Sequence, residues 1–446
     1  MNRNYLVISC LVLLISLANA QAQKSNPSET QDNRQRRVVP AASIPAPSPT
    51  PVLPARANPE TPLGTDSTQK PGVVIGNKPE TQPQLVGPTA TERHTDAASG
   101  ASLLLSPSVV HARLAEAQRM LKSRPQPTAM SLPATDLVTL TALDRTTSRI
   151  HLVMLYKTTF LTKGAEVTMT SSHGTPLSIR VLRANGVNTA VAIFDGEGRS
   201  LVPLMVQYPI EKGGVFREMA YYTSVHPALF SPELARSGQA YVRTMIDLAT
   251  KRLREKGVFI SPQIVDVAER LCLVEHVDHE RFRLENRHAL FQEIYSLFAL
   301  NQLDTYRYSV SSAGAGGMVQ MIPWAYNLMK QRHPGVGLIP DFVVGMRTHA
   351  NALQAMLLYM QDTWNDLAAN EDVQYALSAK LATQPELLAA GYNSNAARLP
   401  LYIRRGAGSW RTLIPRETQM YLQIYKSFEG LMPLKQRQAA TGQSVD

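Results

Sequence analysis

A single glutamate interrupts an apolar stretch of this sequence. In the run LCLVEH (residues 271–276), Glu275 follows four apolar residues. Side chains on a helix advance about 100° per residue, so a helix over 262–276 would place Glu275 near the middle of its apolar arc, with Asp266 and Glu269 opposite. A carboxyl group in that position is shielded from water, which raises its pKa and keeps its proton in place near neutral pH. Either the helix is wrongly placed, or Glu275 is a group that the protein keeps partly desolvated for a purpose.

Three later stretches combine small, amide and aromatic residues. The first, SVSSAGAGGMVQMIPWAYN (309–327), has three glycines within four residues, followed by an apolar run that we expect to be helical. Such a loop can approach a ligand closely and present backbone N–H groups at a helix start. In LAAGYNSNAARL (388–399), Tyr392 and Asn393 end an apolar helix, and IPRETQMYLQIY (414–425) follows.

These stretches, in this order, resemble the motifs of the lysozyme-like lytic transglycosylases and the goose-type lysozymes. In that family a helix ends in a catalytic glutamate and is followed by S-x-x-G-A-x-G-L-M-Q-I-M-P, then A-Y-N-A-G, then P-x-E-T-x-x-Y. Residues 311–323 match the first of these three motifs with conservative changes, 391–395 match the second less well, and 415–421 match the third. The resemblance covers residues 261–430 and implies an all-α lysozyme-like domain that acts on peptidoglycan.

The position of the acid departs from the family pattern. The usual spacing before the Gly-Ala pair falls on Gln302, which cannot donate a proton and would indicate an inactive relative. Alternatively, the helix from Ser261 resembles the family's S-P-x-x-V-x-x-V-A-x-x-E helix, which makes Glu275 the acid and residues 278–305 an insertion. His276 then stands where a serine often follows the family's glutamate. We adopt Glu275 as the acid.

Two other acids precede the glycine-rich loop. Asp304 lies just before the loop and is a reserve candidate for the acid. Glu293 lies at the edge of the apolar face of its helix, where a solvated or helix-paired role is expected. Activity that persisted after substitution of Glu275 would transfer the acid role to one of these two.

The resemblance implies a reaction as well as a substrate. Glu275 would protonate the leaving oxygen of the β-1,4 bond between N-acetylmuramic acid and N-acetylglucosamine, and would then act as base while the sugar's C6 hydroxyl closes onto C1. Most glycosidases need a second carboxylate, and none is evident near the motifs, which favours this lyase. The alternatives are a non-catalytic peptidoglycan-binding scaffold and a goose-type hydrolase. The implied substrate-binding residues are Ser311, Gly314, Met318, Gln320, Tyr392, Asn393 and Glu417.

A metal site is the rival interpretation of the same region. His276 and His279 are three residues apart and His288 lies nearby, a spacing that could hold zinc. The HExxH pattern and cysteine partners are missing, so we predict solvated histidines after a helix end, with no metal and no cofactor. For Tyr392 and Asn393, the corresponding alternative is a helix end with a packed tyrosine.

Helical periodicity dominates from residue 226 to 432. Two of the helices begin with the pairs Ser231-Pro232 and Ser261-Pro262, in which serine is a favoured N-cap and proline a favoured first residue. Residues 433–446 are predicted to be a disordered tail. The predicted helices cover 231–257, 261–276, 288–301, 317–331, 351–367, 373–390 and 416–430.

Residues 101–225 are predicted to combine one helix, starting at Ser106-Pro107, with a small antiparallel β domain. Five stretches rich in β-branched residues are separated by turn signals such as TKG and SHGTP. The domain shows no paired carboxylates, so we interpret it as a docking module for an envelope partner. The predicted fold class is therefore multidomain α+β, with a C-terminal all-α lysozyme-like domain. The five predicted strands are 150–157, 165–172, 177–184, 187–195 and 201–209.

The first hundred residues predict export from a bacterial cell. Residues 1–20 read as a signal peptide, and 21–100 as a Pro-rich linker that is disordered because it cannot bury enough apolar surface to fold. Cys10 lies too early in the apolar run for lipidation, which leaves Cys272 without a disulfide partner after cleavage. No later segment is apolar over the length that spans a bilayer. We expect a periplasmic or envelope protein whose net charge of +10 attracts anionic wall polymers or lipid surfaces, not nucleic acid.

Overall fold

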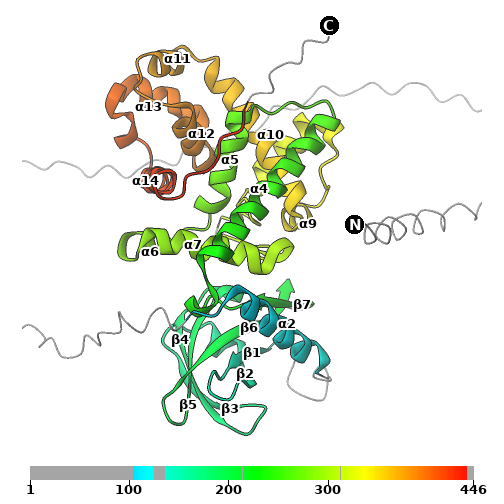
Figure 1. Cartoon of the computed structure of the whole chain (residues 1–446). Coiled ribbons are helices and arrows are strands. Elements are labelled where there is room, and N and C mark those ends of the chain that lie inside the picture. Colours follow the sequence, from blue (N-terminus) through cyan, green and yellow to red (C-terminus); the bar gives the residue numbers. More distant parts are fainter. Residues whose placement is uncertain (1–103, 125–135, 213, 312, 439–446) are drawn as a thin grey trace, which may run out of the picture. The chain divides into compact units, whose positions relative to one another are not determined.

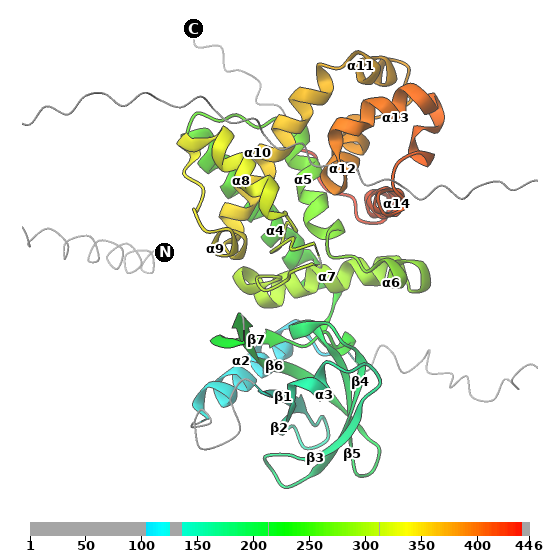
Figure 2. The same cartoon turned by 180° about the vertical axis from the view of Figure 1, so that it is seen from behind.

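The computed structural model describes residues 104–124, 136–212, 214–311 and 313–438 (Figures 1 and 2). The predicted signal peptide, the Pro-rich linker and residues 439–446 lie outside these ranges. Within them, one helix and an antiparallel sheet precede a helical region, so the fold mixes helix and sheet. Both regions belong to one compact unit. None of the helices in these ranges is long and apolar enough to cross a membrane.

The first helix begins where its sequence predicts. Helix α2 spans Pro107–Ser123, and the Ser106 hydroxyl accepts a hydrogen bond from the Val109 N–H at 3.4 Å. This cap satisfies one of the backbone donors that a helix start leaves unpaired. The buried face of α2, which includes Leu121, packs with Leu204 of the sheet.

Seven antiparallel strands form a nearly closed sheet. Its order is β2-β1-β6-β5-β4-β3, and β7 pairs with β6. Strand β6 is the longest and pairs with β1, β5 and β7, so it joins the two halves of the sheet. The strands are β1 (Leu137–Leu143), β2 (Ile150–Tyr156), β3 (Glu166–Thr170), β4 (Pro176–Arg183), β5 (Ala190–Asp195), β6 (Ser200–Lys212) and β7 (Val215–Thr223), with the short helix α3 (Lys157–Phe160) after β2.

Five strands were predicted, whereas the described residues form seven. Strands β2 to β6 correspond to the five predicted stretches, whereas β1 and β7 were not recognised. In β7 the first three residues, which include Arg217, are exposed and the next is Glu218, so its composition does not indicate a buried strand. It forms a strand because β6 supplies hydrogen-bonding partners along its length, and such pairing depends on tertiary context more than on propensity.

The helical region is built around α5 and α10. Helices α4, α12 and α14 all pack against α5, and α4, α5, α8 and α12 pack against α10. Thirteen residues of α10 are buried, which places it in the centre of the largest apolar core. The helices are α4 (Pro232–Glu255), α5 (Pro262–Val274), α6 (His279–Leu284), α7 (Arg287–Asn301), α8 (Pro323–Arg332), α9 (Phe342–Arg347), α10 (His349–Ala368), α11 (Glu371–Ser378), α12 (Gln384–Asn393), α13 (Leu399–Gly406) and α14 (Arg416–Leu431).

Two predicted helices have different bounds. The helix predicted over 317–331 begins only at Pro323, because the preceding residues form a loop in which Gly316 pairs with Val310 and Met321. Gly317 fixes this loop: its φ is +70°, and a Cβ there would lie 2.3 Å from the Met346 carbonyl oxygen.

The helix predicted over 373–390 is two helices, α11 and α12. The second starts with a capping box, in which Thr383 and Glu386 each bond the other's backbone N–H. Helices α3, α6, α9 and α13 were not predicted.

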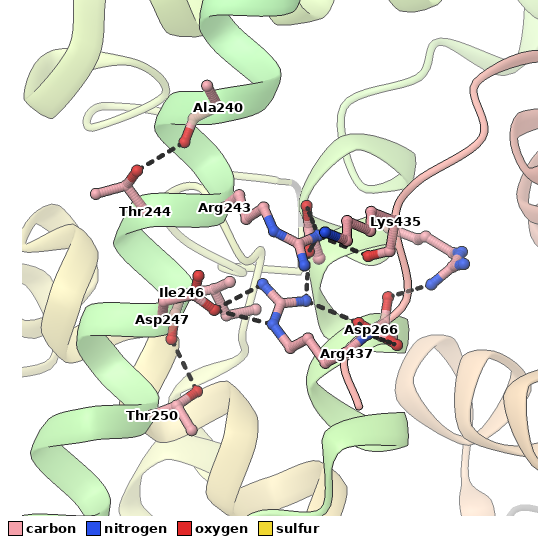
Figure 3. A network of polar contacts seen from close by, with 11 residues as sticks. Ala240, Arg243, Thr244, Ile246, Asp247, Thr250, Asp266, Lys435 and Arg437 are labelled. Carbon is pink, nitrogen blue, oxygen red and sulfur yellow. Dashed lines mark hydrogen bonds and ion pairs between the residues drawn. The ribbon is translucent and has the colours of Figure 1, made fainter. Parts of the chain in front are cut away.

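The outer face of α5 is covered by the C-terminal segment (Figure 3). Asp266 and Glu269 were expected to face solvent, yet both are buried. The Arg437 guanidinium lies 2.8 Å from Asp266 Oδ1 and 2.8 Å from Asp247 Oδ1, and it also contacts Glu269. Arg243 of α4 pairs with Glu269 at 3.2 Å. Residues 433–438 are therefore held in place and are not the disordered tail that was predicted for them.

Candidate functional site

A cavity of about 880 Å³ opens beside the end of α5. Its walls come from α5, the loop of residues 311–322, α8, α10, α12 and α14, which are far apart in the sequence. Of the residues that the sequence predicts for the site, those that line this cavity are Glu275, Ser311, Gln320, Tyr392, Asn393 and Glu417. Gly314 and Met318 do not line it.

Glu275 is the residue that ends α5. It has a helical backbone conformation (φ −59°, ψ −19°), and its N–H still donates to the Leu271 carbonyl at 3.0 Å. The helix proper stops at Val274, two residues earlier than predicted, but the side chain points inward as the apolar arc indicated. The residue remains partly exposed, so a ligand in the cavity can reach it.

The environment of Glu275 favours its protonated form. Burial, assisted by the nearby charge of Glu417, raises the pKa of this carboxyl to about 8. Tyr421 opposes the shift, because its hydroxyl donates a hydrogen bond of 2.5 Å to Glu275 Oε1 and so favours the ionised form. At neutral pH the carboxyl therefore holds a proton and is oriented by one fixed donor.

Tyr421 is a site residue that sequence reasoning missed. It belongs to the PRETQMY stretch, four residues after Glu417, and a spacing of four places both on the same face of α14. Both line the cavity. Burial raises the pKa of Tyr421 well above its ordinary value, so its hydroxyl stays a neutral donor. The helical spacing was a signal available in the sequence, but the partner of Tyr421 was not.

The glycine-rich loop turns back on itself at one wall of the cavity. The Ser311 hydroxyl accepts a hydrogen bond from the Ala315 N–H at 3.0 Å, and the Gly314 N–H donates to the Ser311 carbonyl at 2.9 Å. Gln320 has a positive φ of 46°, and its own side-chain Nε2 donates to the Gly317 carbonyl at 2.8 Å. A non-glycine residue in this conformation is strained, and the hydrogen bond holds it at the cavity wall.

Met318 contributes its backbone to the site. Its side chain is fully buried in the core and does not line the cavity. The Met318 carbonyl accepts a hydrogen bond from His276 Nε2 at 2.9 Å, which ties the loop to the residue that follows Glu275.

Tyr392 and Asn393 lie in the last turn of α12. The Tyr392 hydroxyl donates to the Val319 carbonyl at 2.7 Å, and its ring packs against Tyr359, with centroids 5.9 Å apart. Tyr392 is thus a packed tyrosine at a helix end, as the structural alternative proposed, and also a wall of the cavity. Asn393 Oδ1 is buried without a hydrogen-bond partner among the described residues, so it can accept one from a ligand.

The histidines considered for a zinc site have different surroundings. His276 stacks on Tyr306 with ring centroids 3.5 Å apart, and burial lowers its pKa to about 3, which keeps it neutral. His279 lines the cavity. Over the ranges that the structure describes, no three His, Cys, Asp or Glu residues gather closely enough to hold a metal ion.

The other positions considered for the acid lie outside the cavity. Gln302 is an exposed residue at the end of α7. Asp304 pairs with Arg307 at 3.1 Å, and Glu293 forms two hydrogen bonds of 2.7 Å to Arg281. These ion pairs occupy both carboxylates, and of the candidate acids only Glu275 lines the cavity.

More carboxylates line the cavity than the sequence indicated. Glu417 is close enough for its charge to raise the pKa of Glu275, so the expectation that no second acid lies nearby was wrong. Asp362 and Asp366 of α10 also line the cavity, and Asp362 pairs with Arg332 at 3.2 Å. Motifs distant in sequence bring these groups together, which their spacing could not reveal.

Comparison with known proteins assigns no family to this site. The chain matches no family model, no curated protein and no solved structure.

Proposed function

We propose that this protein is an exported peptidoglycan lytic transglycosylase with a lysozyme-like helical domain. The observation that carries the proposal is Glu275, a carboxyl whose pKa is about 8, positioned by Tyr421 in a cavity shared with Gln320 and Asn393. A protonated, partly desolvated carboxyl is the group that cleavage of a glycosidic bond requires.

The reaction uses Glu275 twice. The carboxyl donates its proton to the leaving oxygen of the bond between N-acetylmuramic acid and N-acetylglucosamine, and becomes a carboxylate. The carboxylate then takes the proton of the C6 hydroxyl while that oxygen bonds to C1, which gives a 1,6-anhydro sugar and restores the acid. Tyr421 donates to Oε1 and stabilises the carboxylate between the two steps.

The amide and hydroxyl groups of the cavity suit a sugar. Asn393 Oδ1 is an acceptor without a hydrogen-bond partner among the described residues. Gln320 and Ser311 contribute polar side chains from the loop of residues 311–322. The resemblance assigns the same residues to substrate binding. We propose that Gly314 shapes the loop and that Tyr392 supports the loop through its hydrogen bond to the Val319 carbonyl.

Hydrolysis is a second candidate because of Glu417. A hydrolase activates water with a second carboxylate near the acid, and Glu417 lines the same cavity and acts on the pKa of Glu275. The product separates the two reactions, since hydrolysis leaves a reducing end and transglycosylation leaves an anhydro ring. A non-catalytic scaffold would leave neither.

The test is digestion of purified sacculi with the protein lacking residues 1–20. Mass spectrometry is expected to find 1,6-anhydromuropeptides for the native sequence and none for Glu275→Gln. A matched control is Glu255→Gln, which removes a carboxylate 59% exposed at the end of α4 and away from the cavity. Reducing ends in place of anhydro ends would support the hydrolase, and intact sacculi would support the scaffold. Activity that persists in Glu275→Gln would contradict the assignment of the acid.

We assign the sheet and the Pro-rich linker to attachment. The sheet gives the helical domain a separate surface on which an envelope protein can dock, and the linker gives it reach. The excess positive charge of the chain favours anionic wall polymers or lipid surfaces.

A further inference from the structure

The cavity continues well beyond the residues that surround Glu275. Helix α8 supplies one wall with Trp324, Leu328 and Arg332, which are spaced four residues apart and so share one face. At 1.5 Å per residue, Arg332 lies about 12 Å along α8 from Trp324. Trp324 is 65% exposed, which is unusual for this residue type and leaves its ring open to a ligand.

Helix α10 supplies the facing wall over the same length. Tyr359 packs on Tyr392 and so marks the end nearer Glu275. Asp362 and Asp366 follow on α10, and by the same rise Asp366 lies about 10 Å along the helix from Tyr359. The ion pair of Asp362 with Arg332 joins the two walls at this end.

The two ends of the cavity differ in charge. Near Glu275 the cavity has amides and hydroxyls, the protonated carboxyl of Glu275 itself, and one carboxylate, that of Glu417. The far end has three fixed charges, one positive on Arg332 and two negative on Asp362 and Asp366. Asp362 is neutralised by Arg332 at 3.2 Å and also contacts His333 at 3.1 Å.

Asp366 is the charge that remains available. It is exposed, lines the cavity and makes no hydrogen bond or ion pair within the part of the chain that the structure describes. Arg332 is 46% exposed and meets Asp362 through Nη1, so its other nitrogens can still donate. An unpaired carboxylate and a partly free guanidinium fit a ligand with both an ammonium and a carboxylate. An N-acetylated disaccharide has no ammonium, and its one carboxylate, on the lactyl group of muramic acid, is blocked where a peptide is attached.

We infer that the far end of the cavity binds the zwitterionic end of a diamino acid in the peptide that peptidoglycan carries. The ammonium donates to Asp366 and the carboxylate accepts from Arg332, while the glycan occupies the end near Glu275. This inference rests on the proposed function, and it makes the protein selective for peptide-bearing strands over strands stripped of their peptides.

Binding to a protein that cannot turn over its ligand tests the inference. In the Glu275→Gln background, calorimetry compares three probes: a disaccharide with a peptide ending in a diamino acid, the same disaccharide without peptide, and the peptide form with its amine acetylated. We expect the first probe to bind several-fold more tightly than the other two. Adding Asp366→Asn should weaken the first probe about three- to tenfold, the range of one partly exposed charge pair.

Combining acetylation of the peptide amine with Asp366→Asn shows whether Asp366 receives the ammonium. If Asp366 receives the ammonium, acetylation and Asp366→Asn remove the same interaction, so together they cost no more than either alone. Glu255→Gln, which removes an exposed carboxylate elsewhere, should leave the ratio of the affinities for the first two probes unchanged. The contribution of the peptide should also weaken as salt is added.

Two outcomes would overturn the inference, and they differ from failure of the proposed function. Equal affinity for all three probes, or losses from acetylation and Asp366→Asn that add up, would show that the peptide end binds elsewhere. That result would leave anhydro products from sacculi unaffected. Absence of binding for every probe, together with intact sacculi, would reject both proposals.

Discussion

Replacing Glu275 with glutamine is expected to stabilise the protein at neutral pH. The ordinary pKa of glutamate is 4.5 and that of Glu275 in the folded protein is about 8. Between these values the folded state must keep the carboxyl protonated while the unfolded state ionises, and this costs the folded state about 1.4 kcal/mol for each pH unit. At pH 7 the cost is about 3 kcal/mol, which partial exposure of the residue reduces to about 2.

The upward direction of the Glu275 pKa shift determines the pH range in which the stabilities of Glu275→Gln and the native protein differ. A raised pKa in the folded state gives the native protein its full stability below pH 4.5, and that stability is lost as pH rises toward 8. Glutamine is neutral at every pH and can still accept the hydrogen bond from Tyr421. The variant should therefore match the native protein at pH 4, exceed it by about 2 kcal/mol at pH 7, and gain no more above pH 8.

Urea denaturation at pH 4, 7 and 9 measures this difference, with Glu255→Gln as the control for loss of an exposed carboxylate. We expect the control to track the native protein at all three pH values. A gain for Glu275→Gln that is the same at pH 4 and pH 7 would refute the reasoning, because it would show that the carboxyl is not held protonated by its surroundings.

Two other predictions concern neighbours of the site. Arg437→Gln should lower the free energy of unfolding by about 3 kcal/mol, because it leaves the buried carboxylates of Asp266 and Glu269 with less compensating positive charge. Thermal denaturation measures this loss, with Gln436→Ala as the control. Equal losses for the two variants would contradict the prediction. The rate of glycan cleavage should fall above pH 8, as Glu275 loses the proton that the first step needs. Tyr421→Phe removes the hydrogen bond that favours ionisation, so a pH–rate profile should show this loss at higher pH together with a lower maximal rate, and a shift to lower pH would be inconsistent with the assigned donor.

Local signals in the sequence determined where many elements begin. All three Ser-Pro pairs mark a helix start, because proline fits the first turn, and at Ser106 and Ser231 the serine hydroxyl also accepts from a backbone N–H. Both effects act within a few residues. The inward direction of Glu275 was predictable for the same reason, since helical geometry depends only on position along the helix. The motifs that resemble those of lytic transglycosylases were also recognisable, and most of the site residues that the resemblance implied line the cavity.

Contacts between distant segments were decided by the tertiary structure alone. Tyr421 and Glu275 are 146 residues apart, and no local rule pairs them or brings Glu417 to the same cavity. A loop replaces the start of the helix predicted over 317–331, because Gly317 packs closely on the Met346 carbonyl. Propensity and periodicity describe how a segment interacts with itself, whereas burial, pKa and the shape of a cavity depend on what packs against it.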